Sequence, residues 1–270
     1  MKQRNVIFRD SEIVEFCKAT RDTNEIHDPV FMSKMGKRVI VPGMFALSRT
    51  LILAFDFLKN DANYIKVFFN SLLSSGDFAT LRAEENPADP REIRLSAINH
   101  KDTLTSNNEY TRIQKKENLS LKEFPGILRR LEIEPGQVEK FTRLIGPCDP
   151  DIAHFLFAVA NASQALLHCI VKPLTETERE MDDVVNGNSK VSPFYQALEI
   201  QIPSPFPVFN PGDHLDYFIR FETEKHYKLY TAYLRCESNG IKLYHSVYHL
   251  VGIPDMVIFR MAKDATPPRK

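Results

Sequence analysis

Two apolar helical segments, one in each half of the chain, constrain its fold more than any other feature. The first segment, MFALSRTLILAFDFL, carries apolar residues around most of a helix circumference: Met44, Phe45, Leu47, Leu51, Ile52, Phe55 and Leu58. A helix that is apolar on all sides must be buried within the protein. The segment DIAHFLFAVANASQALLHCIV, residues 151–171, has the same character. We therefore expect two buried helices, each needing its own surrounding layer.

Short segments typical of β-strands follow each of these helices. YIKVFF, FATLRAE, EIRLSAINH and NEYTRIQ come after the first, and ALEIQI, LDYFIRFE, YKLYTAYLRCES and GIKLYHSVYHLVGI come after the second. The turn pairs Gly76–Asp77 and Gly212–Asp213 fall between the first and second strand of each run. The repeated order predicts an α+β protein with an internal duplication, in which antiparallel strands surround each helix.

Boundaries follow from this order. We expect a first repeat at residues 1–113, a linker at 114–130, a second repeat at 131–260 and a short tail at 261–270. The linker contains the highly charged QKKENLSLKE. The segment after the second apolar helix, residues 172–190, is polar and is expected to be an insertion.

Composition excludes several classes of protein. Thirty-five basic and thirty-five acidic residues cancel, which argues against nucleic acid or an anionic membrane as a partner. The four cysteines are widely separated, so neither a disulfide framework nor a zinc site is indicated. The sequence lacks the apolar runs of a signal peptide or a membrane span. We expect a cytoplasmic protein with no metal or other cofactor.

One loop combines side chains that can do acid–base chemistry. FCKATRDTNEIHDPVFMS, residues 16–33, places Asp22, Asn24 and His27 within six positions, directly after a short helix that starts near Asp10. In an arbitrary loop such residues cap turns, and the histidine is a surface group. The surrounding sequence must decide between a turn and a site.

The loop and the later segment VPGMF resemble the two motif elements of the MaoC-like, R-specific enoyl-CoA hydratases (hydratase 2). The second element contributes Gly43 and Met44, and the first matches at these positions: Thr20, Asp22, Asn24, Ile26, His27 and Ser33. The resemblance extends over roughly residues 5–113, and the second half resembles a degenerate copy. It implies a double hot-dog fold, with each sheet wrapped around its buried helix.

The resemblance also implies an activity. The family hydrates trans-2-enoyl thioesters or dehydrates R-3-hydroxyacyl thioesters, carried on coenzyme A or acyl carrier protein, in fatty-acid or polyketide-type metabolism. Asp22 would be the base and His27 would help it to activate one water. Asn24, Gly43 and Met44 would form the substrate-binding side, with Gly43 at a helix start that stabilises the thioester oxygen.

Three positions depart from the family pattern: Arg21, Glu25 and Pro42 replace glycine, proline and histidine. Arg21 could pair with Asp22 and lower its basicity, and Glu25 could compete for the water. Two alternatives therefore stay open: a non-catalytic acyl-thioester-binding or assembly subunit, and a hot-dog acyl-thioesterase. The chain is expected to act as a monomer or homodimer.

Other candidate sites are weaker. Asp149 directly precedes the second apolar helix and is expected to cap it, with His154 inside that helix, so a second active site is not predicted. His245 and His249 share one strand face but lack a third metal ligand. The second half has no counterpart of the His27 loop, and the space this leaves predicts a long pocket for medium or long acyl chains.

Overall fold

The structure is a computed structural model. It describes residues 2–60, 63–70, 72–99, 109–114, 124–185, 191–202, 209–210, 212–224, 229–254, 257 and 260–262. Its helices are α1 (Asp10–Thr20), α2 (Pro29–Lys34), α3 (Gly43–Leu51), α4 (Phe55–Asn60), α5 (Gln137–Ile145) and α6 (Pro150–Val185), with the short 3-10 helices η1 (Glu25–His27) and η2 (Ile52–Ala54). Its strands are β1 (Lys2–Ile7), β2 (Tyr64–Phe69), β3 (Phe78–Asn86), β4 (Asp89–Asn99), β5 (Glu109–Gln114), β6 (Ile127–Glu132), β7 (Val191–Gln201), β8 (His214–Glu224), β9 (Leu229–Ser238) and β10 (Ile241–Pro254).

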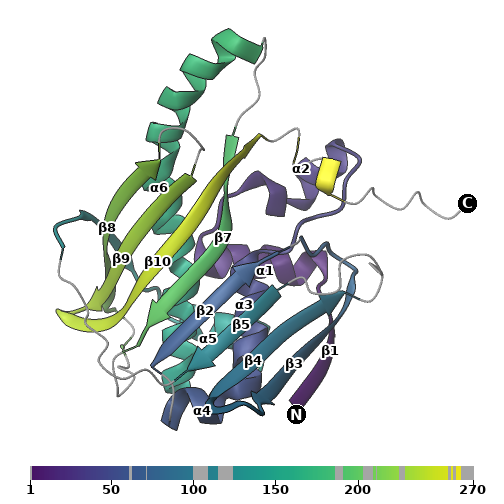
Figure 1. The fold of residues 1–270 in the computed structure, drawn as a ribbon, viewed down its shortest axis with the longest axis vertical. Coiled ribbons are helices and arrows are strands. Elements are labelled where there is room, and N and C mark those ends of the chain that lie inside the picture. Colours follow the sequence, from purple (N-terminus) through teal and green to yellow (C-terminus); the bar gives the residue numbers. More distant parts are fainter. Residues whose placement is uncertain are drawn as a thin grey trace, which may run out of the picture.

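The described strands form one antiparallel ten-stranded sheet in the order β1-β3-β4-β5-β2-β7-β10-β9-β8-β6 (Figure 1). The first five strands in this order come from the first half of the chain and the last five from the second. From the outer edge inward, the two halves read β1-β3-β4-β5-β2 and β6-β8-β9-β10-β7, so each strand has a counterpart. We call the junction between β2 and β7 the seam. The α+β duplication predicted from the sequence is confirmed in this order.

The two Gly-Asp turns show the same duplication in atomic detail. The Asp77 N–H donates to the Ser74 carbonyl, and the Asp77 carboxylate accepts from the Ser74 N–H, both at 3.1 Å. The Asp213 N–H donates to the Asn210 carbonyl at 3.0 Å, and the Asp213 carboxylate accepts from the Asn210 N–H at 2.6 Å. The intervening glycines have φ values of 72° and 91°, which favour glycine. Both turns connect the first and second strands after their helix.

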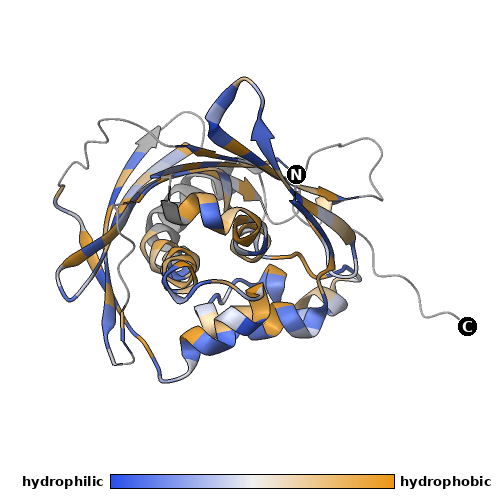
Figure 2. Cartoon of the chain, turned by 90° about the horizontal axis from the view of Figure 1, so that it is seen from below, coloured by the Kyte–Doolittle hydropathy of each residue, from blue (hydrophilic) through white to orange (hydrophobic). Residues whose placement is uncertain are grey.

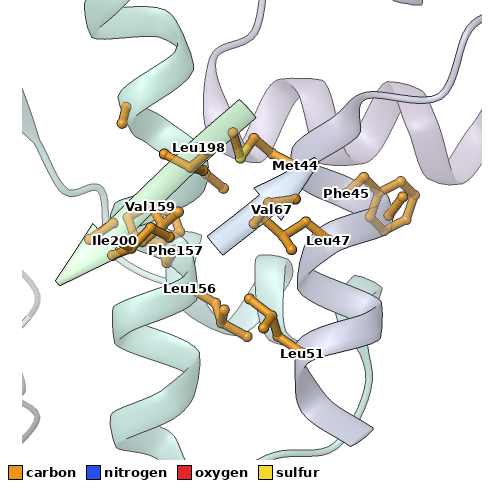
Figure 3. Close-up of a cluster of buried hydrophobic side chains, with 14 of the residues drawn as sticks. Met44, Phe45, Leu47, Leu51, Val67, Leu156, Phe157, Val159, Leu198 and Ile200 are labelled. Atoms are coloured by element: carbon orange, nitrogen blue, oxygen red, sulfur yellow. The ribbon is translucent and has the colours of Figure 1, made fainter. Parts of the chain in front are cut away.

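The sheet curves around the buried helices (Figure 2). Helix α3 packs against β3, β4 and α6, and α6 packs against β7 and β8. Side chains from both helices meet those of the seam strands in one core (Figure 3), including Met44, Leu51, Leu156, Val67 and Leu198. Burial of each such side chain stabilises the folded protein by about 1.5–3 kcal/mol. This core fixes the start of α3 beside the seam.

Some elements differ from the sequence-based expectation. The polar segment 172–190, which the sequence predicts to be an insertion, is helical as far as Val185, because helix α6 continues into it. Strand β6 crosses the expected boundary at residue 131 and matches β1, so strand order would divide the chain before Ile127. The remaining domain boundaries stay predictions. Most of the charged linker segment, residues 115–123, and the end of the tail, residues 263–270, lie outside the described residues.

No helix in the described ranges has both the length and the apolar character needed to cross a bilayer.

Candidate active site

The end of α1 places Asp22 in the site. The helix finishes at Thr20, and Arg21 adopts the left-handed conformation with φ 53°. The Asp22 N–H then donates to the Cys17 carbonyl at 2.9 Å, which closes the last helical turn. The chain therefore leaves the helix sharply and carries the Asp22 carboxylate away from the helix axis. This conformation is one that glycine adopts readily, which gives a physical reason for the glycine of the family pattern at this position.

The Arg21 guanidinium lies elsewhere than the sequence suggested. It donates to the Glu132 carbonyl at 3.0 Å and pairs with the Glu134 carboxylate at 2.9 Å. Both partners belong to the second repeat, at and just beyond the end of β6. The guanidinium that could have paired with Asp22 pairs with Glu134 instead, and Arg21 ties the loop to the end of β6.

Asn24 organises the loop beyond Asp22. Its N–H donates to Asp22 Oδ1 at 3.0 Å, and its side-chain oxygen accepts from the Ile26 N–H at 3.4 Å. One oxygen of the Asp22 carboxylate is thus engaged by the backbone. The other, Oδ2, lies 3.8 Å from His27 Nε2.

The orientation of His27 follows from its second ring nitrogen. Nδ1 lies 2.7 Å from the Ile40 carbonyl, and a carbonyl can only accept, so Nδ1 carries the proton. In the neutral ring Nε2 then has a free lone pair directed toward Asp22. The 3.8 Å separation is too long for a direct hydrogen bond and suits one water held by both groups. Both side chains are 10% exposed, so the pair is shielded while still reachable from a cavity.

The first Gly-Asp turn supports the carbonyl that orients His27. The Ile40 N–H donates to the Ile26 carbonyl at 3.1 Å, and Ile40 forms an isolated bridge with Ser74. Two residues earlier, Arg38 pairs with the fully buried Asp77 at 2.8 Å. The Gly-Asp turn, which the sequence marked only as part of the repeat, therefore also holds the backbone around Ile40 in place.

Helix α3 begins at the same cavity. Pro42 is its N-cap, and the Pro42 carbonyl accepts from the Phe45 N–H at 2.9 Å. The Gly43 and Met44 N–H groups come before the first intrahelical donor and point out of the helix start. A Cβ on Gly43 would lie 2.9 Å from the ring of Phe69, so the glycine lets this ring pack on the helix start.

The predicted site residues share one cavity with residues that sequence analysis missed. This inner cavity has a volume of about 80 Å³. It is lined by all five predicted residues, by residues of the first half around them, and by three residues of the second half. The predicted residues are Asp22, Asn24, His27, Gly43 and Met44, and those of the second half are Ser163, Phe194 and Tyr195.

A wider groove lies on the other side of the loop. This outer groove has a volume of about 400 Å³ and shares Asp22, Asn24 and His27 with the inner cavity. Its remaining lining combines charged residues such as Lys18 and Arg21 with apolar ones such as Val14 and Pro29, and most of the exposed lining surface is apolar. The carboxylate and imidazole therefore stand where the two spaces meet.

The other two residues that depart from the family pattern, Glu25 and Pro42, line different spaces. Glu25 is exposed and lines only the outer groove, whereas Pro42 lines the inner cavity next to Gly43. Cys17, the thiol nearest in sequence, is no nucleophile, because burial and then the charge of Asp22 raise its pKa far above the ordinary value.

Asp149 and His154, the secondary candidates of the second repeat, make hydrogen bonds to the backbone. The Asp149 carboxylate accepts from the Asp151 N–H at 3.0 Å, which caps α6 as expected. His154 accepts from the Phe209 N–H at 3.2 Å, and burial lowers its pKa. Across the described residues no group of three or more His, Cys, Asp or Glu side chains could hold a metal ion, and this includes His245 and His249.

Comparisons with known proteins agree with this architecture. No protein-family model and no curated protein matches the sequence. Among solved structures, a MaoC-like dehydratase from Phytophthora capsici superposes with a TM-score of 0.58 at 12% identity, covering 94% of this chain and 95% of that one. A putative MaoC domain protein dehydratase from Chloroflexus aurantiacus gives 0.58 at 9% identity, covering 94% and 95%.

A third similar structure carries a different title. A putative oleoyl thioesterase from Lactobacillus plantarum gives a TM-score of 0.51 at 7% identity, covering 93% of this chain and 96% of that one. At these identities the likeness shows the fold. The chain has the double hot-dog fold of the MaoC-like dehydratases, which confirms the fold that the sequence resemblance implied.

Proposed function

We propose that this protein adds water to trans-2-enoyl thioesters and catalyses the reverse dehydration of R-3-hydroxyacyl thioesters. One observation carries the proposal: Asp22 Oδ2 and His27 Nε2 lie 3.8 Å apart at a cavity that also contains the start of α3. A base, an imidazole and unpaired helix amides are the groups that this reaction needs.

In the proposed mechanism one water supplies both the hydroxyl group added to C3 and the proton added to C2. Asp22 Oδ2 accepts a proton from the water while His27 Nε2 accepts the second hydrogen bond and fixes its direction. The water oxygen forms a bond to C3, and the C2–C3 π electrons move to the thioester oxygen. The Gly43 N–H and the positive end of α3 stabilise that oxygen. Protonated Asp22 then returns its proton to C2, and the enolate collapses to the saturated thioester.

The carrier is coenzyme A or acyl carrier protein, and the pathway is of the fatty-acid or polyketide type. The outer groove, with a volume of about 400 Å³, reaches Asp22 from the loop side and would hold the pantetheine portion that both carriers share. We place the protein in the cytoplasm.

A thioesterase is the second candidate, because a putative oleoyl thioesterase shares the fold. Asp22 and His27 would then direct the same water at the thioester carbonyl carbon, C1, and a free thiol would be released. The start of α3 would stabilise the oxygen in either reaction.

Incubation of the full chain with crotonyl-CoA separates these functions. We expect loss of the absorbance of the conjugated thioester, with no free thiol detected by a thiol reagent. Thiol release would favour the thioesterase. Binding without either change would leave a non-catalytic acyl-thioester-binding protein and would overturn the proposed reaction.

A further inference from the structure

The size and lining of the inner cavity indicate a substrate class, an inference that rests on the proposed function. We infer that the site takes short acyl groups, about the length of a butenoyl chain, and that the ring of Phe69 sets this limit together with that of Tyr195. This replaces the long pocket expected from the sequence.

The volume of the inner cavity limits the length of the acyl group. The inner cavity measures about 80 Å³, whereas an apolar cavity that holds one benzene measures about 150 Å³. About half that space accommodates a double bond and a methyl-sized group beyond it. A chain of eight carbons does not fit without moving the walls, and packed walls resist such movement.

Two aromatic rings close the cavity across the seam. Phe69 lies at the end of β2 and packs so closely on Gly43 that a Cβ there would be 2.9 Å from the ring. Its ring centroid is 5.8 Å from that of Tyr195 on β7, and Tyr195 in turn lies 5.6 Å from the ring of Tyr248. The ring of Phe69 is therefore held between the helix start and the second half of the chain.

A β-bulge turns Tyr195 toward the cavity. Along the β7–β10 pair His249 lies opposite Ala197, but the next residue, Leu250, lies opposite Tyr195. Gln196 is the extra residue, and its side chain is exposed. Without the bulge, the alternation of the strand would direct Gln196 inward instead of Tyr195. The bulge therefore places the ring of Tyr195 at the cavity, where a regular strand would place the amide of Gln196.

Helix α6 also contributes to this wall, because the buried Ser163 side chain lies beside Tyr195.

The start of α3 assigns the acyl group to the inner cavity. Gly43 and Met44, whose N–H groups would face the thioester oxygen, line the inner cavity and not the outer groove. The outer groove is left for the carrier.

Binding of saturated acyl-CoA thioesters to the full chain tests the inference without requiring turnover. Isothermal titration calorimetry with butyryl-CoA and octanoyl-CoA should give a Kd at least about ten-fold lower for butyryl-CoA, since one unaccommodated methylene alone changes recognition by about 10-fold or more. In Phe69→Ala the octanoyl-CoA affinity should rise by about ten-fold or more. Phe69→Leu should change the ratio of the butyryl-CoA and octanoyl-CoA Kd values in the same direction, but by less.

Phe68→Ala is the matched control. Phe68 is the neighbouring residue of the same type on β2, and its ring lies under the Lys66 ammonium, 5.3 Å from its centroid, away from the cavity. This variant should keep the wild-type preference for butyryl-CoA.

Equal or tighter binding of octanoyl-CoA than of butyryl-CoA by the wild type overturns the short-chain inference. An unchanged ratio of the two Kd values in both Phe69 variants overturns it as well. A preference for butyryl-CoA in a protein that leaves crotonyl-CoA unchanged supports this inference and removes the hydratase. Hydration of all chain lengths at similar rates removes this inference and leaves the hydratase intact.

Discussion

Two hydrogen bonds decide what Asp22 and His27 can do. The Asn24 N–H engages Asp22 Oδ1, and the Ile40 carbonyl engages His27 Nδ1. The remaining atoms, Oδ2 and Nε2, are left to face each other. Each group is thus oriented by backbone, which moves less than a side chain and keeps the pair ready for one water.

Replacement of Arg21 tests whether the departure from glycine matters for the reaction. Arg21→Gly should leave kcat for crotonyl-CoA within about two-fold, because the guanidinium binds Glu132 and Glu134 and not Asp22. Stability should change by less than about 1 kcal/mol, since relief of the left-handed conformation and loss of an exposed ion pair oppose each other. A steady-state assay and a thermal melt check both values. A loss of about ten-fold or more with a displaced pH–rate profile would show that Arg21 acts on Asp22.

The sequence predicted that Asp22, Asn24, His27, Gly43 and Met44 gather at one site, and all five line the inner cavity. It did not predict Phe69, Ser163 or Tyr195. The position of Tyr195 depends on a bulge that appears only when β7 pairs with β10, and no local pattern in the sequence encodes that pairing. Likewise, the partner of Arg21 became visible only once the end of β6 was placed beside it.

Among the elements, α3 is held against both halves of the chain by Arg49. Its guanidinium donates to the Leu144 carbonyl at the end of α5 and to the Glu12 carboxylate of α1, both at 2.8 Å. It also packs over the rings of Phe45 and Phe8, 4.4 and 5.2 Å from their centroids. These contacts fix the helix whose start forms one side of the site.

Arg49→Met should therefore destabilise the protein by about 2–3 kcal/mol, because a buried carbonyl and a carboxylate lose a charged donor. Urea unfolding measures the change. As a control, Arg91→Met removes an ion pair whose arginine is 66% exposed, and it should have an effect below about 0.5 kcal/mol. Equal effects of the two substitutions would contradict the role given to Arg49.

The two edge strands show why some elements escaped prediction. In both β1 and β6 five of the six residues are exposed. An edge strand with little buried surface has no alternating apolar pattern, so nothing in KQRNVI or ILRRLE separates it from a loop. The inner strands bury one face and carry the pattern, and they were predicted.

For the whole molecule, the seam joins the duplicated halves into one sheet. Strands β2 and β7 pair from Tyr64 opposite Gln201 to Phe68 opposite Ala197. On this pair the Glu199 carboxylate accepts from Tyr64 Oη at 2.7 Å and from Lys66 Nζ at 2.6 Å. The order of elements predicted two related halves, but the register that joins them depends on long-range pairing.

Acidification should weaken the seam. Burial acts to raise the pKa of Glu199, but hydrogen bonds from Lys66 and Tyr64 outweigh it and hold the pKa below the ordinary value of 4.5. A lowered folded-state pKa means that Glu199 contributes stability above about pH 4.5 and loses it as pH falls through the folded-state pKa. Glu199→Gln should thus lower the free energy of unfolding by about 1 kcal/mol at pH 7.

Urea titrations between pH 7 and pH 3 provide the measurement. The difference between wild type and Glu199→Gln should shrink as pH falls. Glu15→Gln, at the exposed pair with Lys18, should show no measurable difference. A Glu199→Gln difference that is constant with pH would mean that the carboxylate charge is not what stabilises the seam.

A double-mutant cycle on Asp22 and His27 with crotonyl-CoA measures whether the two residues act together on one water. Asp22→Asn and His27→Ala should each reduce hydration by about 10²–10⁴-fold with the fold intact, and the double variant should lose little more than the worse single one, because both residues serve one water. Asp10→Asn, which alters an exposed carboxylate at the start of α1 and lines neither the inner cavity nor the outer groove, should keep wild-type turnover. Fully multiplicative losses would contradict a shared water. A wild type that binds crotonyl-CoA and leaves it unchanged would contradict the proposed hydration.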